Sequence, residues 1–237
     1  MTRTVAVLLA GGTGRRMGAD VPKQLLDVAG KPILAHTLDV FTAARSVDDI
    51  VVLMPAEHVD AARRIIDHYG YSVRHLGPGG ATRDASTRAA LGVLADEDPD
   101  TKVLIHDAVR PLVTVDQVDA CAAILDRFDA ATLAVPTTDT IVGVSSNGDV
   151  DLVTDLPDRA GLRRVQTPQA FRLGLLARCH EAAVTDTGFV PTDDCGVVRR
   201  YAPDVPIAVV AGSDDNIKVT HPQDVDLADR LLRDRTL

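Results

Sequence analysis

The segment VAVLLA (residues 5–10) leads directly into the glycine-rich segment GGTGRRMG (residues 11–18). The first segment predicts a strand that is buried on both faces, because aliphatic residues occupy every position. Glycines after such a strand let the backbone approach a ligand closely and direct its N–H groups at an anion. Arg15, Arg16 and Lys23 add three cations nearby. The stretch therefore predicts a phosphate-binding loop; the alternative is an ordinary glycine-rich turn with solvated arginines.

Two common phosphate-binding patterns do not fit this loop. A dinucleotide fingerprint that starts at Gly12 requires a third glycine where the chain has Met17. A P-loop requires Gly-Lys-Ser/Thr, and this tripeptide does not follow. The first mismatch disfavours a dinucleotide site, and the second disfavours a P-loop.

Composition and charge exclude several classes of partner. The chain has 237 residues, of which 46% are hydrophobic, so it is long enough for one large α/β domain. It carries 25 basic and 34 acidic residues, for a net charge of −9. Nonspecific attraction to nucleic acid or to an anionic membrane is therefore not expected, and a polyanionic ligand must be held by a local cluster of cations.

The cysteines and the apolar segments bear on the compartment. The cysteines are odd in number, far apart and without a C-x-x-C pair, which argues against both a disulfide framework and a zinc site. They are Cys121, Cys179 and Cys195. The first apolar run is too short for a signal peptide, and no segment approaches the length of a membrane span. We therefore expect a cytoplasmic protein.

Apolar runs that are typical of buried strands alternate with helical patterns along the chain. Strands are expected at residues 49–55, 72–76, 102–106, 131–136 and 206–211, and helices at residues 32–44, 57–69, 82–95, 115–128, 173–184 and 221–233. A further helix is expected to start at the sequence TDDC (residues 192–195), which has the form of an N-cap followed by acidic residues. The alternation predicts an α/β fold with a mostly parallel sheet, in which ligands bind beyond the carboxyl ends of the strands.

Residues 137–164 interrupt this alternation. Two short strand patterns, at residues 140–144 and 150–153, flank an Asn-Gly turn, which predicts a β-hairpin. The hairpin either packs locally or reaches a partner subunit. We favour an arm that reaches a partner, because the segment has few large apolar residues with which to form a core of its own.

Six motifs together resemble the 2-C-methyl-D-erythritol 4-phosphate cytidylyltransferases. They occur in the order of that family, from the first strand to the last helix. The motifs are AGGTGRRM (residues 10–17), PKQ (22–24), GG (79–80) with Arg83 and Ser86, HDAVRP (106–111), TPQ (167–169) and DNIKVT (215–220).

The resemblance implies a three-layer, Rossmann-like nucleotidyltransferase (GT-A-like) fold, with residues 1–237 as one domain and residues 137–164 as an inserted arm. It implies transfer of CMP from CTP to 2-C-methyl-D-erythritol 4-phosphate, giving 4-diphosphocytidyl-2-C-methyl-D-erythritol and pyrophosphate, in non-mevalonate isoprenoid precursor biosynthesis. The attacking group is then a phosphate monoester with a second pKa near ~6, which is mostly dianionic at neutral pH. Such a group needs no general base, but it does need cancellation of charge.

The resemblance also assigns the nucleotide site and the catalytic cations. The implied nucleotide-binding residues are Ala10, Gly11, Gly12, Thr13, Gly14, Arg15, Gly80, Arg83 and Ser86. The implied catalytic residues are Arg16, Lys23, Arg159 and Lys218. Ala81 departs from the acidic residue that some members carry at this position, which puts one base contact in doubt.

A Mg²⁺ ion is implied as the cofactor, with Asp107 and Asp215 as its ligands. Mg²⁺ prefers a few carboxylates together with substrate phosphates, and Asp107 ends a predicted strand. The alternative for each aspartate is a cap or turn residue. His106 is interpreted as a packing residue and not as a ligand.

The second substrate is implied to bind through Arg110, Thr140, Arg159, Thr167, Thr192 and Lys218. Members of the family dimerise through the arm, so Arg110, Thr140 and Arg159 are candidates to act in the partner's site. From the sequence alone, Arg159 also fits a solvated turn residue.

Three other functions remain open from the sequence. One is a related pyrophosphorylase that acts on a sugar 1-phosphate or on ribitol phosphate. The second is a nucleotide sensor without catalysis, and the third is a Rossmann oxidoreductase, which Met17 disfavours.

Overall fold

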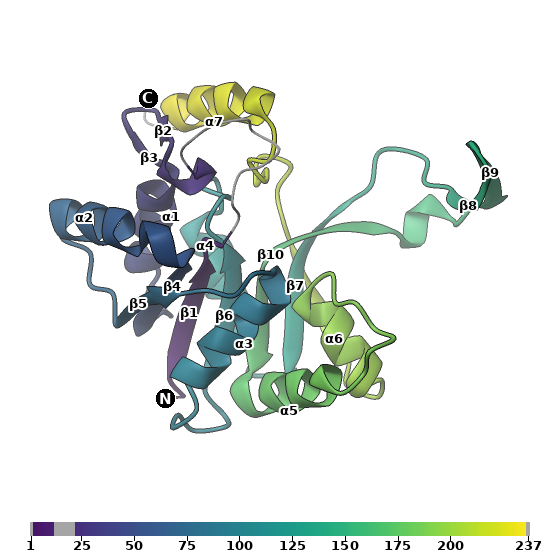
Figure 1. Ribbon diagram of the computed structural model, residues 1–237, viewed down its shortest axis with the longest axis horizontal. Coiled ribbons are helices and arrows are strands. Elements are labelled where there is room, and N and C mark those ends of the chain that lie inside the picture. The colour runs from purple at the N-terminus through teal and green to yellow at the C-terminus, as the bar shows by residue number, and fades with distance from the viewer. Residues whose placement is uncertain (1, 12–21, 236–237) are drawn as a thin grey trace.

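The computed structural model describes residues 2–11 and 22–235, and its centre is a seven-stranded sheet (Figure 1). In spatial order the strands are β11 (Ile207–Ala211), β7 (Ala130–Pro136), β10 (Arg163–Arg172), β6 (Lys102–Asp107), β1 (Thr4–Leu9), β4 (Asp49–Met54) and β5 (His75–Pro78). Neighbouring strands run parallel, except that β10 is antiparallel to both β6 and β7. The predicted α/β class with a mostly parallel sheet is confirmed.

Helices cover both faces of the sheet and give three layers. One face carries α1 (Ile33–Ala43), α2 (Val59–Tyr69) and α4 (Val115–Ile124), and the other carries α3 (Arg83–Val93), α5 (Leu173–Val184) and α6 (Asp194–Tyr201). Helix α7 (Pro222–Asp234) packs on the short ribbon of β2 (Asp27–Val28) and β3 (Lys31–Pro32). Short 3-10 turns are η2 (Lys23–Leu25), η3 (Ala56–His58) and η4 (Arg159–Gly161). Within the described ranges, no helix is long and apolar enough to cross a membrane.

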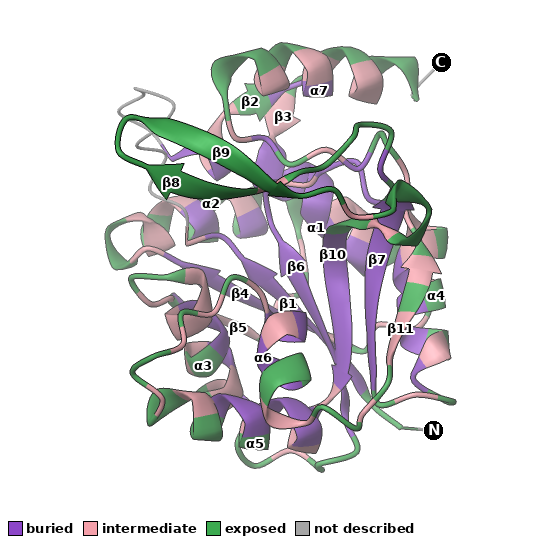
Figure 2. Ribbon diagram, turned by 90° about the vertical axis from the view of Figure 1, so that its right-hand side faces the viewer, coloured by how far each residue is buried: buried purple, intermediate pink, exposed green. Residues whose placement is uncertain are grey.

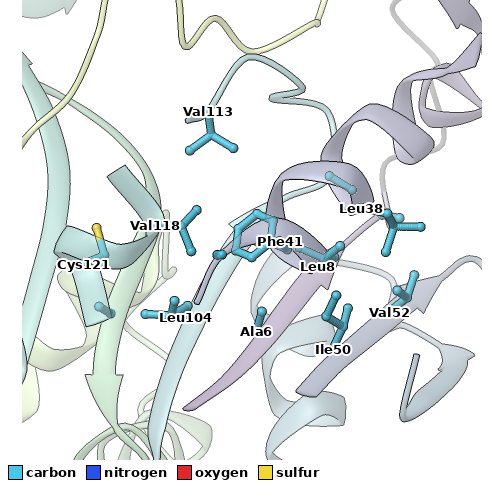
Figure 3. Close-up of a cluster of buried hydrophobic side chains, with 14 of the residues drawn as sticks. Ala6, Leu8, Leu38, Phe41, Ile50, Val52, Leu104, Val113, Val118 and Cys121 are labelled. Atoms are coloured by element: carbon cyan, nitrogen blue, oxygen red, sulfur yellow. The ribbon is translucent and has the colours of Figure 1, made fainter. Parts of the chain in front are cut away.

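Strand β1 explains why the sheet needs cover on both faces. Ala6 and Leu8 point into the core under α1, where Phe41 also lies (Figure 3). Val5 and Val7 point into the opposite core, with residues of α3, α5 and α6. Every residue of the strand is buried, as the aliphatic run predicts for a central strand (Figure 2).

Several element boundaries differ from the predictions. Strand β5, the third strand of the main sheet in chain order, begins at His75 and not at the predicted residue 72. Helix α4 ends at Ile124, four residues before its predicted end. Helix α6 is capped by Asp193, whose carboxylate accepts a hydrogen bond from the Gly196 N–H at 2.7 Å, so Thr192 lies one residue before the cap. The segment after the arm forms β10, which is an antiparallel strand inside the sheet. An apolar sequence pattern does not distinguish such a strand from a parallel one.

The hairpin predicted around the Asn-Gly turn is present. Strands β8 (Gly143–Asn147) and β9 (Val150–Asp155) pair only with each other among the described strands, and Gly148 supplies a φ of 71° at their turn. The hairpin projects away from the sheet, and its residues are exposed along nearly their whole length (Figures 1 and 2). It extends from the end of β7 and the start of β10, and β10 already begins at Arg163, one residue before the predicted end of the arm.

The core under α1 gives a test of the fold. Phe41→Ala removes a fully buried ring that packs 4.9 Å from the His106 ring, centroid to centroid, and should lower the free energy of unfolding by roughly 3–5 kcal/mol. Urea denaturation followed by circular dichroism measures the change. Val190→Ala, at a side chain that is 82% exposed, is the matched control and should shift the same free energy by less than about 0.5 kcal/mol. Equal losses in the two variants would contradict the packing described.

Candidate active site

Asp107 is the centre of a charged cluster at the carboxyl end of β6. Its Oδ1 lies 3.4 Å from Arg83 Nε, and its Oδ2 lies 2.9 Å from Lys218 Nζ and 3.6 Å from Arg110 Nε. Burial alone would raise the pKa of this carboxyl, but the charges of Lys218, Arg83 and Arg110 outweigh burial and hold the pKa well below its usual range. Asp107 is thus ionised, and three cations surround one anion. The excess positive charge suits a polyanionic ligand.

The glycine-rich loop leaves the sheet beside this cluster. Leu9, the last residue of β1, pairs with Asp107 across the sheet, and the Ala108 N–H donates to the Leu9 carbonyl at 3.0 Å. Ala10 and Gly11 therefore start the loop at the edge of the cluster. Gly12, Thr13, Gly14 and Arg15, which the resemblance assigns to the nucleotide, and Arg16, which it assigns to catalysis, lie outside the described residues.

Lys23 reaches the same end of the sheet from η2. Its Nζ donates to the Val219 carbonyl at 2.8 Å, and the side chain is buried. Val219 follows Lys218 in the chain, and its N–H donates to the Val109 carbonyl at 2.9 Å, two residues after Asp107. Two lysines far apart in the sequence are thereby brought to one site.

The second glycine cluster packs against the start of the first. Ser86 Oγ accepts from the Gly80 N–H at 3.1 Å and donates to the Thr82 carbonyl at 2.9 Å. A Cβ at Gly11 would lie 3.1 Å from Ser86 Oγ, and one at Gly80 would lie 2.6 Å from the backbone carbon of Ala85. Close packing therefore excludes a side chain at Gly80, and the described part of the predicted nucleotide set comes together here.

Arg83 and Thr192 meet across a small hollow. The hollow is shallow and is lined by Arg83, Asp84, Pro191, Thr192, Asp193 and Asp194. The structure thus places a residue predicted for the nucleotide beside one predicted for the second substrate.

Thr167 is placed beside Asp107, with its hydroxyl already engaged. Thr167 Oγ1 accepts from the Asp107 N–H at 3.1 Å and lies 3.0 Å from His106 Nδ1. His106 Nε2 lies 3.2 Å from the Arg110 carbonyl, and burial lowers the pKa of this histidine to about 3. These contacts agree with the interpretation of His106 as a packing residue.

Thr140 and Arg159 lie on the arm and are exposed. Arg159 Nη1 donates to the Thr138 carbonyl at 2.9 Å, within the arm itself. The structure therefore brings Arg83, Arg110, Thr167 and Lys218 to Asp107, whereas Thr140 and Arg159 belong to the arm, which projects away from the sheet (Figure 1).

The carboxylates fit a metal that is shared with a substrate, and not a metal cage built from protein alone. In the part of the chain that the structure describes, no three His, Cys, Asp or Glu side chains are arranged to hold an ion. Asp107 offers one ionised carboxylate at the charged cluster, which fits Mg²⁺ that takes most of its ligands from phosphates and water. Asp215 is half-exposed and lies 3.6 Å from Arg235 Nη2.

The comparisons with known proteins decide the family. The sequence profile described as IspD: 2-C-methyl-D-erythritol 4-phosphate cytidylyltransferase matches residues 4–234. The chain belongs to this family. The resemblance that the six motifs carry is confirmed.

Three relatives illustrate the range of the IspD family. A 2-C-methyl-D-erythritol 4-phosphate cytidylyltransferase from Thermobifida fusca is 46% identical over 233 residues, which cover 98% of this chain and 94% of the relative. The solved structure of 4-diphosphocytidyl-2C-methyl-D-erythritol synthase from Anaerococcus prevotii has a TM-score of 0.83 at 27% identity and covers 98% and 99% of the two chains. A bifunctional ribulose 5-phosphate reductase/CDP-ribitol pyrophosphorylase from Haemophilus influenzae is 38% identical, and the match spans about half of that protein.

Sequence reasoning assigned no role to two buried amides of this IspD chain. Gln24 is fully buried, and its amide donates to the Ala10 carbonyl at the start of the glycine-rich loop. Gln169 is also fully buried and accepts from the Asp194 N–H at 3.0 Å while donating to Asp193 Oδ2 at 2.8 Å. Each glutamine directly precedes apolar residues, Leu25 for Gln24 and Ala170 for Gln169, and this was the available signal, because a buried amide needs partners.

The protonation of His106 gives a test of the site. His106 is neutral when folded, with a pKa of about 3, whereas an unfolded histidine titrates near ~6.5. Protons then bind preferentially to the unfolded chain, so this contribution to stability is complete above pH ~6.5 and is lost as the pH falls toward 3. Between pH 6.5 and 5, the wild type should lose about 1.6 kcal/mol more unfolding free energy than His106→Gln. Urea denaturation of both proteins at several pH values measures the difference. The same dependence of the unfolding free energy on pH in both proteins would refute the prediction.

Proposed function

We propose that this chain transfers the cytidylyl group of CTP to 2-C-methyl-D-erythritol 4-phosphate and releases pyrophosphate. One observation carries the proposal: in a chain that belongs to the IspD family over residues 4–234, cations from three segments converge on the buried carboxylate of Asp107. That arrangement provides positive charge where two phosphate-bearing substrates must approach one another.

The chemistry requires positioning and charge cancellation more than proton transfer. The acceptor phosphate is largely dianionic near neutral pH and attacks the α-phosphorus of CTP, which forms a P–O bond while the bond to pyrophosphate breaks. Lys218 is exposed enough, at 42% of its side chain, to leave Asp107 for the acceptor phosphate. We assign Arg16 and Lys23 to the charge that develops at the α-phosphate, on the family pattern.

A divalent cation is the expected cofactor, and we propose Mg²⁺. Asp107 would hold it together with the triphosphate, and Asp215 is the second candidate ligand. When bound, the ion supplies further neutralisation of the triphosphate charge. On the family pattern, Gly80, Ser86 and the backbone of Ala10 and Gly11 would receive the cytosine base, and the hydrogen bond from the Gly80 N–H to Ser86 Oγ holds two of these residues together.

We further propose that two copies of the chain pair through the arm. A two-stranded hairpin has little stability of its own, and the arm that carries it leaves several apolar side chains exposed. They are Ile141, Val142, Val144, Val150, Leu152, Val153 and Leu156. A second copy that covers them would also bring Thr140 and Arg159 to the partner's acceptor site.

One relative supports a second candidate substrate. The similarity to the CDP-ribitol pyrophosphorylase covers nearly all of this chain at 38% identity, so a ribitol phosphate is the alternative acceptor of the same reaction. Both acceptors are polyol phosphates, and the cluster at Asp107 would serve either one.

Pyrophosphate release from CTP and Mg²⁺ tests the acceptor. We expect turnover with 2-C-methyl-D-erythritol 4-phosphate that exceeds turnover with ribitol 5-phosphate in kcat/KM. Lys218→Ala should lower kcat/KM by roughly 100-fold or more, because a positioned cation at the transferred group is lost. Lys31→Ala is the control and should retain activity, because Lys31 lies on the β2–β3 ribbon and pairs with Asp39 of α1. Equal or better turnover with ribitol 5-phosphate would transfer the assignment to the alternative.

The oligomeric state tests the arm. Leu152→Asp combined with Leu156→Asp places two charges among the exposed apolar side chains of the arm. The double variant should sediment as a monomer instead of a dimer and should lose activity. Val209→Asp, at an equally exposed valine on β11, is the matched control and should leave the dimer intact. A fully active dimer in the arm variant would count against this proposal, as would a monomeric wild type.

A further inference from the structure

Strand β10 is interrupted beside the active site. Its register against β7 shifts within residues 165–169, so the ladder of the two strands does not serve the carbonyls in between. Side chains serve them instead. Thr132 Oγ1 donates to the Gln166 carbonyl at 3.3 Å, and Asn216 Nδ2 donates to the Thr167 carbonyl at 3.1 Å. A buried backbone carbonyl needs a donor, so these two side chains complete the interrupted strand.

The amide of Asn216 is fixed in orientation by its partners. Asn216 is fully buried, and its Nδ2 faces Gln166 Oε1 at 3.3 Å as well as the Thr167 carbonyl. Gln166 is itself oriented, because its Nε2 donates to the Ser213 carbonyl at 2.7 Å and its Oε1 accepts from the Ser213 N–H at 3.4 Å. Asn216 therefore meets two acceptors and must present its nitrogen to them. Its Oδ1 is buried and has no hydrogen-bond partner among the described residues, so the side chain acts through its donors.

The backbone of Asn216 is joined to two cations that the family pattern gives to the acceptor phosphate. Its carbonyl accepts from Arg110 Nη1 at 2.7 Å, and Nε of the same guanidinium lies 3.6 Å from Asp107 Oδ2. Lys218 follows two residues later, and its Nζ lies 2.9 Å from the same carboxylate oxygen. The position of Asn216 therefore sets where Arg110 and Lys218 stand at Asp107.

Lys218 lies between two anchors of its segment. On one side, the Asn216 side chain fastens the segment to β10. On the other side, the Val219 N–H donates to the Val109 carbonyl at 2.9 Å. The side chain of Lys218 is 42% exposed, so its place depends on the backbone that carries it more than on packing. Loss of the first anchor would free the residues before Lys218 to leave β10, together with the carbonyl that holds Arg110.

We propose that Asn216 is a positioning residue for the acceptor phosphate: its amide fastens residues 216–219 to β10 and thereby holds Arg110 and Lys218 in the arrangement that receives a dianion. The proposal rests on the transfer to a polyol phosphate proposed above. Asn216 is buried, touches no substrate and acts through these two cations. The residues assigned to the nucleotide lie at the end of β1 and at the start of α3, and the hydrogen bonds of Asn216 lead to neither. The acceptor should therefore be affected more than CTP.

Steady-state kinetics of Asn216→Ala test this role. The KM for 2-C-methyl-D-erythritol 4-phosphate should rise by about tenfold, the scale of one lost hydrogen bond to a charged group, while the KM for CTP should change by less than about twofold. Thr132→Val is the matched control, because it removes the donor of the neighbouring carbonyl in the same interruption of β10. It should lower the stability in urea and leave both KM values unchanged.

Asn216→Asp is a second variant, which keeps the size and shape of the side chain and replaces the amide donors by carboxylate oxygens. It should show the same split between the two KM values, and it leaves no gap that could prevent folding. A folded variant in which both KM values are unchanged, or rise together, would overturn the proposal. Failure of both variants to fold would assign Asn216 to stability alone and would overturn it as well.

The proposed function can fail separately from this inference. If ribitol 5-phosphate is the better acceptor, the same split is expected with its KM. A wild type that turns over neither acceptor would refute the proposed function. The affinity for inorganic phosphate, measured by isothermal titration calorimetry, would then still decide the role of Asn216, because the cations bind an anion without turnover. A loss of about tenfold in Asn216→Ala, with Thr132→Val unchanged, would support the role, and equal affinities would overturn it.

Discussion

One buried carboxylate holds the functional end of this protein together. An ionised carboxylate in the interior is costly unless cations compensate it, and Asp107 obtains that compensation from Arg83, Arg110 and Lys218. These residues come from the start of α3, the turn after β6 and the segment before α7, so one interaction fixes three parts of the chain relative to the sheet. The same cluster leaves more positive than negative charge at the carboxyl end of the strands, where a phosphate can use it.

This local excess matters because the chain as a whole is acidic, with a net charge of −9. The average field therefore repels polyanions, and selectivity for a phosphate must come from short-range contacts in the cluster. Acidic residues behind the site take part in this arrangement. Asp194 is buried and accepts a hydrogen bond from Arg83 Nη1 at 2.7 Å, so Arg83 is shared between this carboxylate and Asp107.

The sequence predicts most of the fold because strand β1 and its neighbours are uninterrupted aliphatic runs, and such runs have few alternatives to burial in a parallel sheet. It does not reveal that β10 is antiparallel, because strand direction is fixed by pairing across the sheet and leaves no periodic signature. Asp107 and Lys218 are found through motifs. Gln169 belongs to the TPQ motif, but its role is missed because its partners Asp193 and Asp194 are distant in sequence, and only tertiary contacts show that its polar atoms are used.

The arm has a particular relation to the sheet. Pro136 at the end of β7 pairs with Arg163 at the start of β10, so the arm is the tip of a long ribbon whose base lies in the core. Insertions and deletions at the tip of a ribbon leave the register of its base unchanged. A change of length within residues 137–162 therefore leaves the pairing of β7 with β10 unchanged, and the direction in which the arm leaves the body is fixed by these two core strands. The length of the arm can therefore change in evolution while the direction in which it leaves the sheet stays the same.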